Sequence, residues 1–266
     1  MNQSTIIGLS GGLLLLIGMM VMSPDNIGAF LNIPGLIVVL GGTLTATFVS
    51  RPIKEVMEVL RGLRELFRDQ PSTLERDIQQ LLLFARHYRY HKLRLAESGL
   101  TSINNHFLRS SLEKLVGGDS YKELRNAMQW RISGMRSNEQ GKIQVINTMA
   151  VFAPAFGMLG TLFGLVHMLS GLGNSGLSEI GGSMAFAMIT TVYGIIASNL
   201  FFKPLAIKQE RRLAQQLIQM NVLMEGILQI HQQRHPTLIR ETLEAIYTHH
   251  EMGISLPSQL ALVKEG

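Results

Sequence analysis

The sequence predicts an all-α, polytopic membrane protein with four transmembrane helices and a helical cytoplasmic domain. Three observations support this fold class. The 266 residues are 46% hydrophobic and only 16% charged, and the mean hydropathy is +0.21, which is more apolar than an average water-soluble domain. Four apolar segments are long enough to cross a bilayer, which takes about 20 helical residues. All 24 lysines and arginines lie outside residues 1–50 and 143–202, so apolar and basic parts of the chain alternate.

The four expected spans form two pairs along the chain. Residues 1–50 hold the first pair and residues 143–202 the second, and each pair is joined by a link whose only charge is Asp25 or Glu179. Because lysine and arginine resist translocation, the basic segments mark the cytoplasmic side, and both termini are expected there. The first span lacks a basic n-region and a small-residue cleavage site, so we expect it to be retained. The expected spans are Thr5–Met22, Pro34–Ser50, Val145–Leu169 and Ser183–Phe202.

Two segments remain for the cytoplasmic side, residues 51–142 and residues 203–266. Good helix formers without glycine or proline predict helices in the first segment. In the second segment, apolar residues recur at helical spacing until Pro236, and the last residues have no periodicity, so we expect them to be disordered. The expected helices are Leu74–Ser98, Tyr121–Ser133 and Thr237–His250, and the apolar stripe consists of Leu213, Leu217, Met220, Met224 and Ile227.

The composition argues against several classes of function. The chain has no cysteine, so it has neither a disulfide framework nor a thiolate metal site. Its net charge of +5 arises from basic residues interleaved with acidic ones, unlike the single-sign patch of a nucleic-acid-binding protein. No nucleophile with a neighbouring base, no paired carboxylates and no phosphate-binding glycine loop occurs in a usable context. We therefore expect no enzyme, no nucleic-acid binding and no resident metal or cofactor.

Small residues line one face of the third span and one face of the fourth. Association of helices in lipid rests on close packing and hydrogen bonds, which small residues permit. Such stripes are common in helical bundles, so packing is the favoured interpretation of this feature alone. The stripes are Ala153, Gly157, Gly160 and Gly164 in the third span, and Ala187, Thr191, Gly194 and Ser198 in the fourth.

A proline and three threonines distinguish these two spans. Pro154 has no N–H and its ring displaces the carbonyl one turn earlier, so that oxygen needs another partner. The partner is either a neighbouring helix across a tolerated kink or a cation. Thr161 lies on the same stripe as Pro154, and Thr190 and Thr191 lie in the middle of the fourth span. The hydroxyl of a membrane threonine commonly bonds a carbonyl of its own helix, but the four residues together indicate a row of polar groups along these two spans.

An intramembrane charge is missing. Ion-coupled membrane proteins usually keep an ionisable residue inside the bilayer, yet none of the four expected spans contains Asp, Glu, Lys or Arg. If this chain conducts a cation, the carboxylate that binds it must come from another chain.

Three stretches of the sequence resemble a known family. APAFGMLGTLFGLV, MAFAMITTVYGIIASNLFFKPLA and MEGIL look like the MotA/PomA branch of the MotA/TolQ/ExbB family, and the likeness extends over nearly the whole chain. The resemblance implies a stator subunit of the bacterial flagellar motor in the inner membrane. It further implies five copies around two copies of a single-span B subunit, whose membrane aspartate carries the transported Na⁺ or H⁺.

The resemblance also assigns roles to residues of the two spans. Pro154 and Pro204 match prolines associated with coupling ion flow to movement. Thr161 and Thr190 match hydroxyls that line the ion path in sodium-type members, and they would hold Na⁺ only transiently, while Thr191 either joins them or only packs. Because sodium prefers several oxygen ligands, the hydroxyls favour sodium, and the proton remains the alternative.

A charged stretch of residues 51–142 resembles the family's rotor interface. ARHYRYHKLRLAES looks like the stretch in which an arginine and a glutamate eight residues later face a cytoplasmic rotor switch protein. Arg89 and Glu97 have this spacing, which puts both charges on one helical face. Arg86 and Arg94 add competing positive charge, so the sequence leaves open which arginine contacts the rotor.

Two alternatives to this function stay open on the sequence. The first is a non-flagellar ion-driven motor of the TolQ/ExbB type, although those relatives usually have three spans. The second is a membrane transporter or scaffold that acts alone, although the first pair of spans lacks the proline and hydroxyls of the second pair and no internal repeat is evident.

Overall fold

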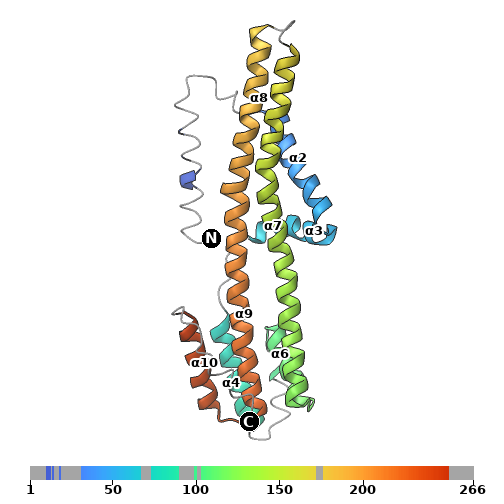
Figure 1. The fold of residues 1–266 in the computed structure, drawn as a ribbon. Coiled ribbons are helices and arrows are strands. Elements are labelled where there is room, and N and C mark those ends of the chain that lie inside the picture. The colour runs from blue at the N-terminus through green and yellow to red at the C-terminus, as the bar shows by residue number, and fades with distance from the viewer. Residues whose placement is uncertain are drawn as a thin grey trace, which may run out of the picture. The chain divides into compact units, whose positions relative to one another are not determined.

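The computed structural model describes residues 10–12, 14, 18, 31–66, 73–89, 99–100, 103–171 and 176–251. The expected first span therefore lies largely outside the described residues, and the segment after residue 251 lies wholly outside them. Every element in the described ranges is helical (Figure 1), which confirms the all-α fold class. The elements are α2 (Ile33–Ser50), α3 (Ile53–Leu66), α4 (Leu74–Arg89), α6 (His106–Val116), α7 (Tyr121–Gly171), α8 (Leu177–Ile196), the π-helix η2 (Ala197–Phe202), α9 (Lys203–His231) and α10 (Pro236–Glu251).

Three helical stretches of the described chain are long and apolar enough to cross a membrane. They are α2, a stretch of α7, and a stretch of the continuous helix from Ser178 to His231. They contain the second, third and fourth expected spans. The expected helix after Pro236 is also confirmed, because α10 covers it with one further residue at each end.

The described residues differ from two sequence-based expectations. A helix Tyr121–Ser133 separate from the third span is wrong, because α7 is one continuous helix of 51 residues. The connecting residues contain no proline, and an interior glycine costs a helix only about 1 kcal/mol. Likewise, Pro236 begins α10 and does not end α9. Proline suits the first position of a helix, because the N–H that it lacks would have no partner there.

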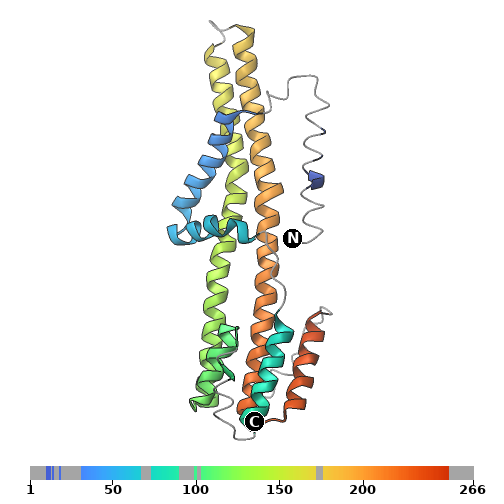
Figure 2. The same ribbon diagram turned by 180° about the vertical axis from the view of Figure 1, so that it is seen from behind.

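The chain divides into two compact units. Unit 1 comprises residues 1–70 and 138–211, and unit 2 comprises residues 71–137 and 212–266. Figures 1 and 2 show that α7 and α9 each continue without a break through the residues where one unit gives way to the other.

Within unit 1, α2 packs against α7 and α8 (Figures 1 and 2). Asn32 caps α2, because its side-chain oxygen accepts a hydrogen bond from the N–H of Gly35 at 2.9 Å, as polar caps commonly do. The N–H of Asn32 donates to the hydroxyl of Tyr193 in α8 at 2.9 Å. Gly42 lies directly against the ring of Phe156 in α7. The start of α2 is therefore fixed to α8 and its middle to α7.

Polar side chains connect α3, α7 and α9 at the end of the apolar part of unit 1, where the amide of Gln209 in α9 donates to Glu139 in α7 at 3.0 Å. The guanidinium of Arg51 donates to Gln144 at 2.7 Å and to Thr148 at 3.2 Å. Lys142 lies 2.8 Å from the carboxylate of Glu139 and 3.5 Å from that of Glu58. Partial burial opposes the charge of Lys142, but the two carboxylates outweigh it and the pKa of Lys142 is raised. An apolar cluster adjoins these groups, formed by Val56, Val59, Val145, Ile146, Met149, Leu205 and Ala206.

Unit 2 has its own hydrophobic core. It is built from α4, α6, the beginning of α7, the end of α9, and α10. Asp77 is buried beside this core and is held by the amide of Asn105 at 2.6 Å and the hydroxyl of Thr73 at 3.3 Å. The largest fully buried side chains of this core are Leu81, Leu108, Leu112, Leu115, Leu124, Met128, Leu223, Ile227, Ile239 and Leu243.

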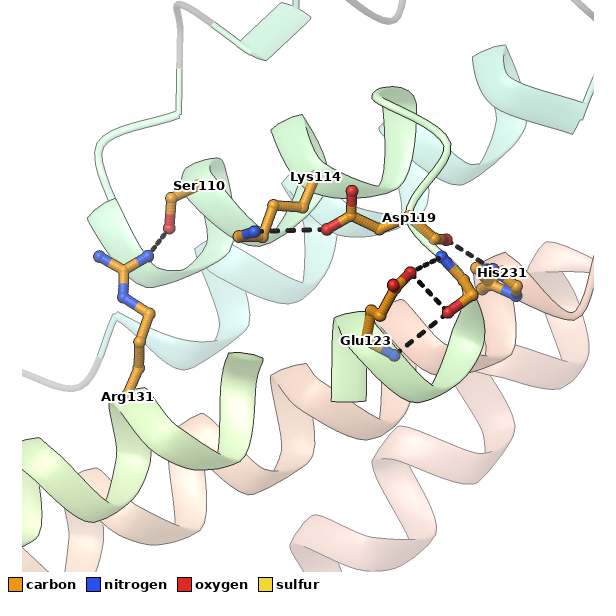
Figure 3. Close-up of polar contacts among 7 residues, drawn as sticks. Ser110, Lys114, Asp119, Glu123, Arg131 and His231 are labelled. Carbon is orange, nitrogen blue, oxygen red and sulfur yellow. Dashed lines mark hydrogen bonds and ion pairs between the residues drawn. The ribbon is translucent and has the colours of Figure 1, made fainter. Parts of the chain in front are cut away.

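A capping box begins α7 (Figure 3). The carboxylate of Glu123 accepts hydrogen bonds from the hydroxyl of Ser120 at 2.7 Å and from its N–H at 3.0 Å. In return the N–H of Glu123 donates to the hydroxyl of Ser120 at 3.4 Å, and this reciprocal pattern satisfies N–H groups that a helix start leaves unpaired. These two bonds hold the pKa of Glu123 below its ordinary value of 4.5. Next to the box, the ring of His231 in α9 bonds the carbonyl of Asp119 at 3.2 Å (Figure 3), which joins the end of α9 to the start of α7.

Candidate ion-path and coupling site

The backbones of α7 and α8 approach each other closely along the small-residue stripes. A Cβ added to Gly194 would lie 2.6 Å from the carbonyl oxygen of Ala153 and 3.2 Å from the Cα of Gly157. One added to Gly164 would lie 2.7 Å from the Cβ of Ala187. Real Cβ atoms do not come so close, so larger residues at these glycines would force the helices apart. The packing interpretation of the stripes is confirmed.

The three threonine hydroxyls lie in different surroundings. Thr190 is fully buried and donates to the carbonyl of Ala187 at 2.8 Å. Thr161 is half-buried and donates to the carbonyl three residues earlier at 2.6 Å. Thr191 reaches across from α8 to the carbonyl of Gly157 in α7 at 3.4 Å. Each hydroxyl uses its proton in these bonds but keeps oxygen lone pairs, which are the groups that a cation would bind.

Thr190 is enclosed by glycines of two other helices. A Cβ on Gly160 of α7 would lie 2.6 Å from the hydroxyl oxygen of Thr190, and one on Gly35 of α2 would lie 3.0 Å from its methyl carbon. Thr190 thus sits where α2, α7 and α8 meet, whereas Thr161 is partly open to the surroundings. In this conformation the oxygen lone pairs of Thr161 are more accessible than those of Thr190.

The carbonyl that Pro154 leaves without its helical donor is that of Ala150, four residues earlier. Ala150 is 3% exposed. The hydroxyl of Ser198 donates to this carbonyl at 2.7 Å, and Ser198 is itself fully buried. The freed carbonyl is therefore bonded by a neighbouring helix. Sequence reasoning placed Ser198 only among the packing residues, because the spacing within one helix says nothing about its partner on another.

The backbone just before Pro204 is a π-helix. In η2 the N–H of Lys203 donates to the carbonyl of Ser198, five residues earlier. Pro204 has no N–H for the carbonyl of Leu200, and its ring presses on that carbonyl in a regular α-helix. A wider turn relieves this conflict, and such π segments recur at functional sites. Pro204 itself is exposed at the start of α9.

Two of the four expected rotor-facing residues are described. Arg86 and Arg89 lie on α4, while Glu97 and Arg94 lie outside the described residues. Arg89 donates to the carbonyl of Gln233 at 3.2 Å, in the turn between α9 and α10.

A basic groove joins these arginines to α10. It has a volume of about 390 Å³, and within the described chain its lining includes no carboxylate. The sequence did not point to the contribution of α10, because only the fold brings that helix beside α4. The groove is lined by Leu82, Arg86, Arg89, His235, Pro236, Thr237 and Arg240.

These features define a class of protein: an all-α membrane protein in which a tightly packed, hydroxyl-bearing helix pair continues into a second helical unit with a basic groove. The charge-free spans of this helix pair, Pro154 inside α7 and Pro204 at the start of α9 are the features to be compared with known proteins.

Comparison with known proteins identifies the family. A model of the MotA/TolQ/ExbB proton channel family matches residues 100–222. Chemotaxis protein PomA of Vibrio alginolyticus is 30% identical over 247 residues, which cover 92% of this chain and 94% of PomA. Motility protein A of Treponema pallidum (strain Nichols) is 28% identical over 243 residues, 91% of this chain and 93% of the relative. The chain belongs to the MotA/TolQ/ExbB proton channel family, in the branch of motility protein A and PomA.

A solved structure agrees with this fold. The flagellar MotAB stator complex from Bacillus subtilis contains a chain that matches with a TM-score of 0.78 at 24% identity, over 98% of both chains. The arrangement of helices described above is therefore the fold of that chain.

Proposed function

We propose that this chain is the A-type stator subunit of a bacterial flagellar motor. With a B subunit it would form an ion channel in the inner membrane, with both termini in the cytoplasm. Family membership supports this proposal, and so does the likeness to a chain of a MotAB stator complex. The observation that carries it is the helix pair without Asp, Glu, Lys or Arg in its spans. A cation path through such a pair needs a carboxylate from a partner.

In the proposed cycle the partner's membrane aspartate binds and releases the cation beside α7 and α8. The half-buried hydroxyl of Thr161 supplies an oxygen to the passing ion, and Thr190 and Thr191 are the further hydroxyls of the path. Pro154 and Pro204 would couple ion passage to movement of the helices. Five copies of the chain would step around two B subunits, and lipids would cover the remaining apolar faces.

Sodium is the ion that the hydroxyls favour. A sodium ion is stabilised by several oxygen ligands, whereas a proton requires only a group that titrates. The test is swimming driven by an imposed sodium gradient or an imposed proton gradient, in wild type and in Thr161→Ala. We expect sodium-driven swimming that Thr161→Ala weakens. Unaltered swimming of the wild type in sodium-free medium would overturn the sodium assignment and leave the proton.

The basic groove between α4 and α10 is the proposed contact with the rotor switch protein. Arg86 and Arg89 line it, and the sequence adds Glu97 and Arg94 as candidates for the same contact. Complementary charges across an interface steer association and fix its register. Reversing the charges of Arg89 and Glu97 together should reduce torque while stators still assemble at the motor. Wild-type rotation in that double variant would end the rotor-contact proposal.

Deletion of the gene tests the flagellar role itself. In a strain without another stator, we expect the deletion to abolish swimming. Unchanged swimming would favour a non-flagellar motor of the TolQ/ExbB type. Full ion flux through the purified chain in vesicles, without a B subunit, would instead favour a transporter that acts alone.

A further inference from the structure

Ser198 carries a fully buried hydroxyl to which the family resemblance assigns no role. Most described serine and threonine hydroxyls of unit 1 bond the carbonyl three or four residues earlier in their own helix, as is usual for these residues. Ser198 differs, because its hydroxyl crosses from η2 to α7, as that of Thr191 crosses from α8 at the longer distance of 3.4 Å. The residues that bond their own helix are Thr43, Thr45, Thr47, Ser50, Thr148, Thr161, Ser170, Ser183 and Thr190.

The acceptor of this hydrogen bond is the carbonyl that Pro154 deprives of its donor. In an uninterrupted α-helix the N–H of residue 154 would bond the carbonyl of Ala150. Ala150 is almost fully buried, so solvent cannot supply the missing donor, and a buried carbonyl without a partner is costly. The hydroxyl of Ser198, at 2.7 Å, occupies this role.

The geometry of α8 brings the hydroxyl within reach. Gly194 lies one turn before Ser198, and the three atoms nearest to a Cβ added there are all main-chain atoms of α7. Because the two backbones are this close, even the short side chain of Ser198 reaches the carbonyl of Ala150. A residue with a Cβ in place of Gly194 would move Ser198 away from its acceptor.

Ser198 also takes part in the π-helix. Its own carbonyl accepts the N–H of Lys203, in the register that precedes Pro204. One residue thus bonds to α7 at the turn disturbed by Pro154 and to its own helix at the turn disturbed by Pro204. A change at either proline alters a hydrogen bond of Ser198.

We propose that Ser198 is a positioning residue that links the two prolines: its hydroxyl replaces the donor missing at Pro154, and its carbonyl holds the π register before Pro204. The structural half of this proposal is independent of the function of the chain. The functional half rests on the proposed stator role: Ser198 transmits a displacement of α7 at Pro154 to the start of α9.

A double-mutant cycle in the full-length chain, purified with its B subunit, tests the structural half. Ser198→Ala removes the replacement donor, and Pro154→Ala restores the natural one. We expect Ser198→Ala to lower the melting temperature by roughly 3–8 °C in the chain with Pro154, and by much less in Pro154→Ala. Thr43→Val is the matched control, because it removes a buried hydroxyl that bonds its own helix. Its effect should be the same in both backgrounds.

The cycle has clear opposing outcomes. An equal loss from Ser198→Ala in both backgrounds would mean that Ser198 only fills space, and the link would be overturned. Should Pro154→Ala fail to fold, Ser198→Cys decides the matter, because it keeps the shape of serine, with a larger sulfur atom in place of oxygen and a weaker donor. Because sulfur is larger than oxygen and Ser198 is fully buried, the melting temperature of this variant should fall below that of wild type. A value equal to that of wild type would contradict the proposal.

The functional half has a separate readout, the torque contributed by each assembled stator. Ser198→Ala should lower torque per stator while the number of fluorescently tagged stators at the motor stays unchanged, and Ser198→Thr should restore torque. Normal torque per stator in Ser198→Ala would refute the functional half. If the chain proves to have no motility role, the melting temperatures still decide the Ser198 contact, so the two failures are distinguishable.

Discussion

Replacing Gly194 by alanine tests whether the close approach of α7 and α8 depends on the missing side chain. The added Cβ would lie 2.6 Å from the carbonyl oxygen of Ala153 and 3.1 Å from the Cα of Pro154. Both are main-chain atoms, so no side chain can rotate away to make room. Since ordinary contact begins at 3.4 Å, the two helices would have to separate by about 0.8 Å here in a closely packed interior.

Opposing contributions set the size of the effect. Alanine stabilises a helix by about 1 kcal/mol relative to glycine. Overpacking of a tight interior contact costs about 1–3 kcal/mol. Separation of the helices also stretches the 2.7 Å hydrogen bond from Ser198 to Ala150, and a buried carbonyl left unpaired costs about 1–3 kcal/mol more. We expect a net loss of about 1–5 kcal/mol in the free energy of unfolding.

The assay is thermal unfolding of the full-length protein in detergent, followed by circular dichroism. Gly182→Ala is the matched control, because Gly182 lies in the same helix and an added Cβ there has nothing within 4 Å. The control should melt at the wild-type temperature or slightly above it. If Gly194→Ala melts as high as Gly182→Ala, the backbones do not approach as described, and the packing argument is wrong.

Three further predictions concern other parts of the chain. The folded-state pKa of Glu123 lies below 4.5, so its carboxylate stabilises the fold above that pH, and this contribution is lost as the pH falls through the folded pKa. Glu123→Gln should remove this pH dependence from acid unfolding curves. An unchanged curve would exclude the effect. Pro204→Ala restores an N–H, so residues 197–202 should take up α-helical register and Ser198 should withdraw from α7. Hydrogen–deuterium exchange should then be slower at the amides next to residue 204. Unchanged exchange would speak against the proline as the cause of the π-helix. Asn105→Ala leaves buried Asp77 without its 2.6 Å amide partner and also removes the side-chain cap of α6. It should destabilise the protein by about 1–3 kcal/mol in denaturant titrations, and a neutral result would contradict both contributions.

The spanning helices were predictable from the sequence, because an apolar run of sufficient length has few alternatives to a helix. The helix α2 begins one residue before the expected second span and ends with it, whereas α8 begins six residues before the expected fourth span and the helix continues through η2 into α9. The continuity of α7 was not predictable in the same way. Its composition changes from polar to apolar near residue 143. Such a change suggests the end of a helix, even though no residue there interrupts the helical backbone.

Some features of the candidate site could likewise be predicted from the sequence, and others required the fold. Pro154 and its freed carbonyl follow from covalent chemistry and could be read from the sequence. The partner of that carbonyl could not, because Ser198 lies 48 positions away from Ala150 and its direction depends on a π-helix that no local propensity predicts. Arg89 was found from the sequence, whereas the contribution of Arg240 to the same groove required the packing of α10 on α4.

The unbroken passage of α7 and α9 through both units constrains how relatives of this chain can be recombined. Unit 2 is assembled from two stretches that are distant in sequence, so no single cut excises it, and a chimera needs two junctions inside helices. At each junction the helical phase must be kept, because one inserted residue turns everything beyond it by about 100°. An insertion or deletion in either helix therefore changes the helical phase of every residue that follows it in that helix.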